Sequence, residues 1–252
     1  MNLIILDARD RLDAGVVTLA DARAAHLLTV LRVTPGQTIR VGLLDGPLGV
    51  GTVRTVHDGG VTLACAFEPN TPPRPRVDLL LAVPRPKVMR RLWAQLAALG
   101  VGQIILTNAE RVERPYFDSH VLEESTYRPL LVEGLQQSGD TRLPAVSIHR
   151  QFKILVEDHL DALAGPGLRL VADPSGTTAV ATAAAAHAGT AHAGTAHQGR
   201  RVLLAVGPEG GWNAYELALL QAHGFSLAGL GPRTLRVDTA CTALLAIVHA
   251  MI

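Results

Sequence analysis

The sequence predicts an α/β protein with a larger C-terminal part built on a parallel β-sheet and a small N-terminal β-barrel. Short apolar runs alternate with helical segments after residue 76, which is the pattern of βαβ units. Three short strands follow one another at even spacing before residue 68, as in a small barrel. A proline-rich segment, residues 68–75, separates the two patterns and predicts an extended boundary between domains. We therefore expect one domain over residues 1–70 and a second over residues 77–252.

In the N-terminal part, the predicted strands are residues 37–43, 50–56 and 60–67. Pro-Gly, Asp-Gly-Pro and Asp-Gly-Gly sequences precede or separate them, and these residue pairs favour tight turns. One helix, residues 20–31, interrupts the barrel.

The C-terminal part opens with an apolar strand at residues 77–83, a helix at 87–99 that Gly100 ends, and a second strand at 103–106. A later strand, residues 168–172, runs into Asp173-Pro174-Ser175-Gly176. The parallel order places this segment at the carboxyl edge of the sheet.

Two glycine-containing turns then follow buried strands. Residues 207–212 (GPEGGW) leave the strand 202–206 and enter a helix, for which Asn213 and Glu216 form a predicted capping box and Gly224 the end. The strand 227–230 leads through a second turn to a helix at 240–251, with Asp238 or Thr239 as its cap. That helix is apolar almost all round, so we expect it to be buried in the core or against a second subunit.

Glycine turns at the carboxyl edge of a parallel sheet let backbone groups approach a small ligand. The residues do not favour a phosphate, because neither GxGxxG nor Gly-Lys-Ser/Thr is present and Glu209 would repel an anion. A neutral or cationic nucleotide-like ligand fits better. The alternative is that these glycines only make tight turns.

Composition excludes several classes of protein. Of the 252 residues, 48% are hydrophobic, yet no uncharged apolar run reaches membrane-spanning length and the start of the chain lacks a signal peptide pattern. Cys65 and Cys241 lie far apart without metal-ligand spacing, which favours buried thiols in a reducing cytoplasm. The net charge of +1 decides little about RNA, because a nucleic acid responds to a local patch.

The two turns together, GPEGGW and LGPRTLRVDTACTALLA, closely resemble the paired C-terminal signatures of the RsmE family. These bacterial enzymes methylate N3 of a uridine in 16S ribosomal RNA. The resemblance implies a SPOUT domain with a C-terminal trefoil knot, S-adenosylmethionine as cofactor and a homodimer whose active sites are completed across the interface. S-adenosylmethionine carries a sulfonium cation and no phosphate, which agrees with the lack of a phosphate-binding lysine after the glycine turns.

Shorter stretches extend the resemblance to nearly the whole chain. His26, residues 30–32 (Val-Leu-Arg) and Gly36 resemble the family's PUA-like, RNA-binding domain, and residues 108–111 keep a family Glu-Arg loop. Residues 133–139 with the later Leu143-Pro144 resemble a family helix. By contrast, residues 94–100 lack the family's lysine and glutamate, and Asp238 replaces a glutamate.

The turns and the resemblance together predict the site residues. Cofactor contacts are expected at Val171, Ala172, Val206, Gly207, Pro208, Glu209, Gly210, Gly211, Leu230, Gly231, Pro232, Leu235 and Thr239. Methylation of N3 places negative charge on the oxygens of the base, which a cation stabilises. Arg236 is the preferred catalytic residue and Arg233 the second, although both could instead bind RNA phosphates or form salt bridges with Glu209 or Asp238.

Other roles stay open at the sequence level. A general base could be Glu209, Asp238 or solvent. Glu209 could anchor its turn or touch the ligand, and Trp212 could stack on a base or pack as a hydrophobic staple. Cys241 is expected in the core.

Basic residues are concentrated in residues 74–91, and this stretch is either an RNA-contacting stripe or a set of solvated charges. The expected RNA-binding residues are Arg32, Arg74, Arg76, Arg85, Lys87 and Arg90. The expected partner is 16S ribosomal RNA or the assembled small subunit, with no membrane.

Residues 182–199 contain Ala-His-Ala-Gly-Thr repeats that place His187, His192 and His197 five apart. That spacing does not align them on one helix face, so a low-complexity insertion is favoured over a metal site. Competing interpretations of the whole chain are a methyltransferase for another ribosomal or transfer RNA site, or a non-catalytic RNA-binding protein of the same fold.

Overall fold

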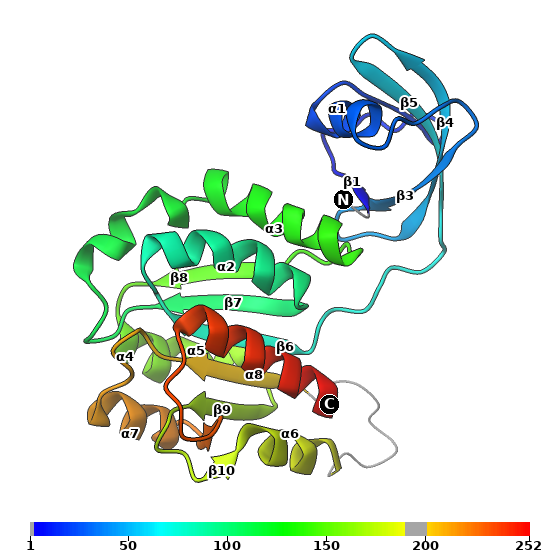
Figure 1. Ribbon diagram of the computed structural model, residues 1–252. Helices are drawn as coiled ribbons and strands as arrows, with labels where there is room; N and C mark the ends of the chain where they lie inside the picture. The colour runs from blue at the N-terminus through cyan, green and yellow to red at the C-terminus, as the bar shows by residue number, and fades with distance from the viewer. Residues whose placement is uncertain (1–2, 190–200) are drawn as a thin grey trace. The chain divides into compact units, whose positions relative to one another are not determined.

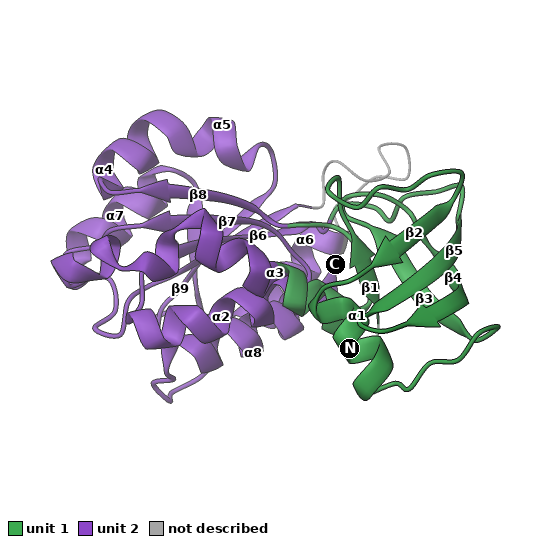
Figure 2. Cartoon of the chain, turned by 90° about the horizontal axis from the view of Figure 1, so that it is seen from above, with its two compact units in different colours: residues 1–74, 132–143 green, residues 75–131, 144–252 purple. Residues whose placement is uncertain are grey.

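The computed structural model describes residues 3–189 and 201–252 and consists of two compact units (Figures 1 and 2). Unit 1 comprises Met1–Arg74 and Val132–Leu143, and unit 2 comprises Pro75–Leu131 and Pro144–Ile252. The chain leaves unit 1 within the proline-rich segment. It returns to unit 1 through residues 132–143, a long-range association that differs from the predicted division at residues 70 and 77.

Unit 1 is a curled five-stranded sheet with the helix α1 and the end of a longer helix, α3 (Glu124–Ser138) (Figure 1). Its elements are β1 (Ile4–Leu6), β2 (Val16–Leu19), α1 (Ala22–Thr29), β3 (Thr38–Leu43), β4 (Leu48–His57) and β5 (Gly60–Phe67). The strand order is β1-β3-β4-β5-β2, with β1 and β3 parallel and the other pairs antiparallel. The three predicted strands and the helix are confirmed. The strands β1 and β2 were missed, because runs of three and four residues carry too little alternation to stand out.

Unit 2 is built on the predicted parallel sheet. Its strands are β6 (Val77–Ala82), β7 (Val101–Thr107), β8 (Ala145–His149), β9 (Leu168–Ala172), β10 (Thr178–Ala179), β11 (Val202–Val206) and β12 (Phe225–Gly229). They lie in the order β10-β12-β9-β11-β6-β7-β8, and every neighbouring pair is parallel. The chain thus inserts β11 between β9 and β6, and then places β12 on the other side of β9. The carboxyl ends of β9, β11 and β12 therefore lie next to one another.

Helices cover both faces of this sheet. They are α2 (Pro86–Ala98), α3 (Glu124–Ser138), α4 (Phe152–Ile154), α5 (Leu160–Ala164), α6 (Val180–Gly189), α7 (Ala214–Ala222) and α8 (Val237–Met251), with two short 3-10 helices, η1 (Arg114–Asp118) and η2 (His120–Leu122), and one π-helix, η3 (Leu155–His159). The helices α2 and α8 lie side by side on one face, and α4 and α5 lie on the opposite face (Figures 1 and 2). Helix α3 begins in unit 2 and ends in unit 1.

The centre of unit 2 is apolar, and its buried charge is paired. All six residues of β6 are buried, including Asp78, whose carboxylate accepts two hydrogen bonds from the Arg201 guanidinium. Burial raises the pKa of Asp78, and the bonds from Arg201 act against this rise. The pair joins β6 to β11 at the start of both strands.

The predicted start of the last helix was wrong by three residues. Helix α8 begins at Val237, with Arg236 as an N-cap residue that makes no side-chain capping bond. Asp238 therefore lies in the first helical turn, where a carboxylate is favourable next to the helix dipole. Cys241 is fully buried, as expected, and burial raises the pKa of its thiol to about 12.

Candidate functional site

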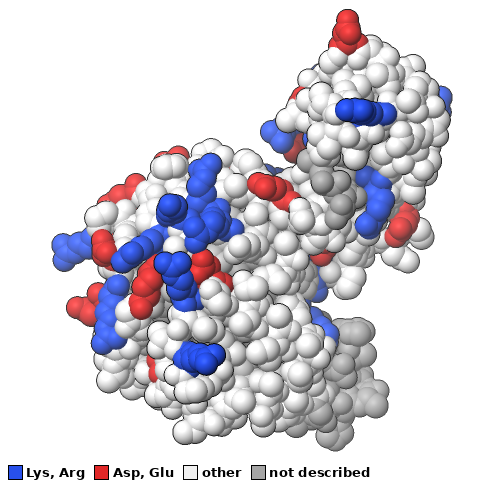
Figure 3. Space-filling view, viewed as in Figure 1, with Lys and Arg blue, Asp and Glu red and all other residues white. Residues whose placement is uncertain are grey.

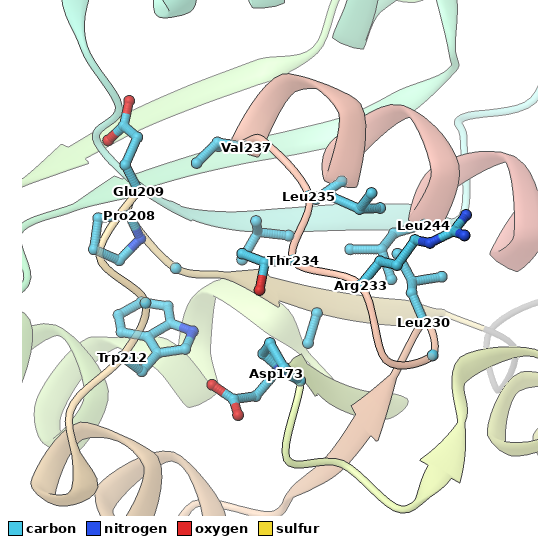
Figure 4. Close-up of a pocket in the computed structure, with 17 residues that line it drawn as sticks. Asp173, Pro208, Glu209, Trp212, Leu230, Arg233, Thr234, Leu235, Val237 and Leu244 are labelled. Atoms are coloured by element: carbon cyan, nitrogen blue, oxygen red, sulfur yellow. The ribbon is translucent and has the colours of Figure 1, made fainter.

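A pocket lies in unit 2 where β9, β11 and β12 end (Figure 4). Its wall comes from the segments that follow these strands and from the first turns of α8. The lining residues are Ala172, Asp173, Pro174, Val206, Gly207, Pro208, Glu209, Gly211, Trp212, Leu230, Gly231, Arg233, Thr234, Leu235, Val237, Ala240 and Leu244. We call this cavity the edge pocket. Its lining is mostly apolar side chains and backbone, and it contains no lysine.

The structure brings most of the predicted cofactor residues together in the edge pocket. These are Ala172, Val206, Gly207, Pro208, Glu209, Gly211, Leu230, Gly231 and Leu235, with Arg233 beside them. The remaining four, Val171, Gly210, Pro232 and Thr239, do not line it. Val171 is fully buried within β9, and Gly210 faces the Arg111 side chain, 2.9 Å from where a Cβ on the glycine would stand.

Sequence reasoning missed several lining residues from α8 and the turns. Val237, Ala240 and Leu244 line the pocket at helical spacing, and this periodicity would have revealed them had the helix been started at the correct residue. Thr234 lies between two predicted residues of the second turn. Asp173 was expected at this edge of the sheet but was not assigned to the site.

Charged side chains hold the first glycine turn, residues 207–212, in place, and one of them is Glu209. Its Oε1 accepts a hydrogen bond from the backbone N–H of Arg85, the N-cap residue of α2, at 3.0 Å. The close-up shows the Glu209 carboxylate directed away from Trp212 and Thr234 (Figure 4). Of the two roles considered for Glu209, the geometry favours the anchor.

Glu216 in the first turn of α7 and Arg111 in the loop after β7 hold the same turn, residues 207–212. Glu216 forms the predicted capping box with Asn213, since its Oε2 accepts from the Asn213 N–H at 2.8 Å and Asn213 Oδ1 accepts from the Glu216 N–H at 2.8 Å. Its Oε1 accepts from the Glu110 N–H at 2.7 Å. The Arg111 guanidinium donates to the carbonyl oxygen of Gly210. The Glu-Arg loop is thus fastened to the glycine turn.

The conformation of both turns requires glycine at single positions. Gly211 has a φ of +72° and Gly231 a φ of +103°, values that residues with a side chain rarely adopt. These two residues let the backbone bend round the edge pocket.

Trp212 is packed inside unit 2 against α4. It is 4% exposed, and its ring centroid lies 5.4 Å from that of Phe152.

A second cavity, the basic hollow, lies in unit 2 next to the edge pocket, since both share Glu209 and Val237. It is lined by Arg85, Lys87, Val88, Arg91, Glu209, Arg236, Val237 and Asp238. Figure 3 shows lysine and arginine side chains gathered with carboxylates on this face of unit 2. The preferred catalytic residue, Arg236, therefore lies in the basic hollow, and Arg233 lies in the edge pocket.

The alternative in which these arginines form salt bridges was wrong for the described residues. Asp238 instead pairs with Arg91 at 2.8 Å, and this hydrogen bond lowers the pKa of Asp238. Neither the Arg233 nor the Arg236 guanidinium has an ion-pair or hydrogen-bond partner within residues 3–189 and 201–252. Both guanidinium groups are exposed to solvent.

The predicted RNA-binding residues divide between the units. Arg85, Lys87 and Arg90 are exposed at the start of α2, whereas Arg76 donates to the carbonyl oxygen of Ile252 at 3.0 Å and is half-buried. Arg32 and Arg74 are exposed in unit 1.

The histidine repeat is only partly described. His187 lies in α6, while His192 and His197 lie outside the described residues. Within the described part of the chain, no three His, Cys, Asp or Glu side chains come together as metal ligands would. No described helix combines the length and apolar character of a membrane span.

The parallel sheet, the edge pocket at its carboxyl edge and the basic hollow beside it define an α/β protein with a mostly apolar cavity next to one lined by arginine and lysine. The chain belongs to the RNA methyltransferase domain family, whose model matches residues 71–249.

Its relatives carry a common name. It is 26% identical over 261 residues to a ribosomal RNA small subunit methyltransferase E from Treponema pallidum, covering 99% of this chain and 91% of the relative. A protein of the same name from Synechocystis is 29% identical over 251 residues, covering 97% and 76%. The predicted RsmE resemblance is confirmed.

Solved structures agree in fold. The ribosomal RNA small subunit methyltransferase E of Neisseria gonorrhoeae, solved with S-adenosyl methionine bound, superposes with a TM-score of 0.73 at 22% identity and covers 99% of this chain and 97% of its own.

Proposed function

We propose that this protein is an S-adenosylmethionine-dependent methyltransferase that acts on N3 of a uridine in 16S ribosomal RNA of the small subunit. The observation that carries the proposal is the juxtaposition of the edge pocket with the basic hollow, in a chain of the RNA methyltransferase domain family. The curated relatives named ribosomal RNA small subunit methyltransferase E support the choice of substrate.

The residues of the edge pocket fit this cofactor. S-adenosylmethionine carries a sulfonium, an adenosine and no phosphate, so it needs apolar walls and backbone polar groups but no lysine. Gly211 and Gly231 hold their turns at positive φ, and the space beside Gly231 is open, so the backbone itself can approach a ligand there. When bound, the cofactor supplies a methyl group already activated on sulfur.

The basic hollow supplies the cation that the reaction requires. Loss of the N3 proton places negative charge on the base oxygens, and the unpaired Arg236 guanidinium stabilises that charge. Arg233 acts as a second cation at the edge pocket. Glu209 Oε1 accepts from the backbone N–H of Arg85, and Asp238 pairs with the Arg91 guanidinium. Both carboxylates thus have structural partners, and we assign the N3 proton to solvent.

Exposed arginine and lysine side chains in both units bind the RNA. Arg85, Lys87 and Arg90 contact RNA phosphates next to the hollow, and unit 1 acts as a PUA-like RNA-binding domain through Arg32 and Arg74. The substrate is 16S ribosomal RNA, free or in the assembled subunit, which places the reaction in the cytoplasm.

Two further features belong to the proposal. The C-terminal segment forms a trefoil knot, which is supported by the insertion of β11 between β9 and β6 and by the return of α8 to pack on β11 and β6. The protein is a homodimer, which is supported by the exposed small residues Thr242, Ala246 and Ala250 along the outer face of α8.

Methyl transfer and cofactor binding, measured separately, test the proposal. Arg236→Ala is expected to lower methyl transfer to 16S RNA about 100-fold, the scale of losing one group that stabilises an oxyanion, and to leave S-adenosylmethionine affinity unchanged. Arg128→Ala, on the exposed side of α3, is the matched control and should retain full activity. If Arg236→Ala lowers methyl transfer and S-adenosylmethionine affinity by the same factor, Arg236 has a structural role in the pocket.

The substrate is tested by mass spectrometry of ribosomal and transfer RNA from a deletion strain. One N3-methyluridine should disappear from 16S RNA. Unchanged 16S RNA with a loss in transfer RNA or in 23S RNA would reject the assigned substrate, and failure of the protein to bind S-adenosylmethionine would reject the enzyme.

A further inference from the structure

The edge pocket and the basic hollow share part of their walls. Glu209, from the first glycine turn, and Val237, from the start of α8, line both cavities. Figure 4 shows these two residues next to each other at one side of the edge pocket. Glu209 follows β11 and Val237 follows β12, so the segment after each strand contributes one residue to the shared wall. A change in the conformation of either segment therefore alters both cavities.

Both segments are also tied to the same helix, α2. Oε1 of Glu209 accepts from the backbone N–H of Arg85, the N-cap residue of α2, at 3.0 Å. The Asp238 carboxylate accepts from the guanidinium of Arg91, further along α2, at 2.8 Å. The partners are 124 and 147 residues apart in the chain, so both are tertiary contacts. Together they fix the start of α2 relative to the shared wall.

The start of α2 carries most of the cations of the basic hollow. Arg85, Lys87 and Arg91 line the hollow, and all three are exposed to solvent. Four basic and two acidic residues line it in all, so it keeps an excess of positive charge, as a site for RNA phosphates requires. Where the three cations stand depends on the backbone of α2, and the two contacts from the glycine turns hold that backbone.

The second glycine turn has few contacts of its own. Residues 231–236 are exposed one after another, and the backbone N–H groups of residues 233–236 make no hydrogen bond within residues 3–189 and 201–252. Segments of this kind open at a low cost in free energy. A ligand in the edge pocket contacts this turn and thereby orders it together with Asp238. RNA that binds in the basic hollow then bears less of the same ordering cost.

We propose that Glu209 and Asp238 are positioning residues that couple the two cavities, so that the cofactor and RNA each bind more tightly when the other is present. Coupling between two sites is reciprocal, so the same factor applies in both directions. This inference rests on the proposed function, because it takes the edge pocket as the cofactor site and the basic hollow as the RNA site. It gives both carboxylates a part in the reaction although neither acts as general base.

The coupling is measured as the Kd of the full chain for a transcript of 16S ribosomal RNA, with and without S-adenosylhomocysteine, at one salt concentration. S-adenosylhomocysteine has no methyl group to transfer and no sulfonium charge, so neither the reaction nor attraction between a bound cation and RNA contributes. At saturation it should lower the Kd for RNA about tenfold. Saturating RNA should lower the Kd for S-adenosylhomocysteine by the same factor.

Variants assign the coupling to the two carboxylates. Glu209→Ala and Asp238→Ala each remove one of two contacts, so each should reduce the factor to about threefold, and the double variant should abolish it. Glu209→Gln should keep the full factor, because its amide oxygen still accepts from the Arg85 N–H. Asp161→Ala is the matched control: Asp161 also pairs with an arginine of unit 2, Arg169 at 2.5 Å, yet neither residue lines either cavity. Its factor should equal that of the unsubstituted protein.

The coupling factor distinguishes positioning from a purely structural role. A residue that only stabilises the fold changes the two affinities but leaves the factor between them unchanged. An unchanged factor in both alanine variants therefore overturns the inference. A Kd for RNA that does not respond to S-adenosylhomocysteine in the unsubstituted protein also overturns it, and that measurement does not depend on how the variants fold.

The same measurements distinguish failure of this inference from failure of the proposed function. If the unsubstituted protein binds S-adenosylhomocysteine and 16S RNA independently of each other, only the inference fails. If it binds S-adenosylhomocysteine but not the RNA, or binds neither, the proposed function and the inference fail together.

Discussion

Replacing Glu216 by alanine is expected to destabilise unit 2 by about 3 kcal/mol or more. The Glu216 side chain is 3% exposed and accepts two backbone hydrogen bonds, from Asn213 at 2.8 Å and from Glu110 at 2.7 Å. A hydrogen bond to a charged group contributes about 1.5–3 kcal/mol, so the loss of both gives at least 3 kcal/mol. For a domain of this size, that corresponds to a fall in Tm of roughly 6–12 °C.

Urea unfolding followed by tryptophan fluorescence measures this loss in unit 2 alone. Both tryptophans, Trp93 and Trp212, belong to that unit, so the signal does not report on unit 1. The urea midpoint should fall while the slope of free energy against urea stays constant, which marks a change in stability and not in the unfolded state.

Two further variants sharpen the result. Glu216→Gln keeps one acceptor oxygen and turns an amide donor toward the other N–H, so a loss of about 2 kcal/mol is expected. Glu110→Gln changes an exposed neighbouring side chain and should stay within about 0.5 kcal/mol of the unsubstituted protein. An unchanged midpoint for Glu216→Ala would refute the reasoning, because it would mean that a buried carboxylate and its two donors contribute nothing.

Three other predictions concern pH and the second glycine turn. The hydrogen bond from Arg91 lowers the pKa of Asp238, so its stabilisation is present above the unfolded pKa near 3.9 and is lost as pH falls through the lower folded value. Since Arg91 is half-exposed, Asp238→Asn should lower the free energy of unfolding by less than about 1 kcal/mol at pH 6, and thermal melts at pH 3 should show a smaller difference. Burial lowers the pKa of His249, so the neutral form contributes stability above the unfolded pKa near 6.5 that is lost as pH falls below it. Urea midpoints between pH 7.5 and 5 should therefore fall less steeply for His249→Gln than for the unsubstituted protein, and equal slopes would contradict this account. Gly231→Ala forces a side chain onto a φ of +103° at a cost of about 1–3 kcal/mol, and calorimetry should show weaker S-adenosylmethionine binding. Gly59→Ala, at a φ of +74° with open space around it in unit 1, is the control that should lose stability and keep its affinity.

Local sequence patterns were sufficient for the central strands and the capped helix. The bounds of β9 and β11 agree with the prediction residue by residue. For β11 the reason is that a strand covered on both faces is a continuous apolar run, and all five of its residues are buried. The capping box of Asn213 and Glu216 is encoded within four residues, so it was also predictable.

Contacts between residues far apart in the chain leave no pattern in the local sequence from which they could be predicted. Arg201 and Asp78 are 123 residues apart, and Arg111 and Gly210 are 99 apart, so nothing in either local sequence identifies the partner. The same holds for residues 132–143, which continue a helix of unit 2 but associate with unit 1. The family resemblance located the edge pocket, yet it did not show which side of the turn the Glu209 carboxylate takes.

The orientation of the Glu209 carboxylate affects which ligands the turn at residues 207–212 can bind. Glu209, Arg111 and Glu216 all hold the turn through contacts with α2 or with the loop after β7, and none of these contacts is made across the edge pocket. Besides Glu209, the turn contributes Gly207, Pro208, Gly211 and Trp212 to the pocket lining. The turn can therefore border a site for a ligand that has a carboxylate of its own, because the Glu209 carboxylate is hydrogen-bonded to the Arg85 backbone N–H. Affinity for the cofactor then depends on residues that do not touch it, and Glu216 is the one whose removal releases both the helix start and the neighbouring loop at once.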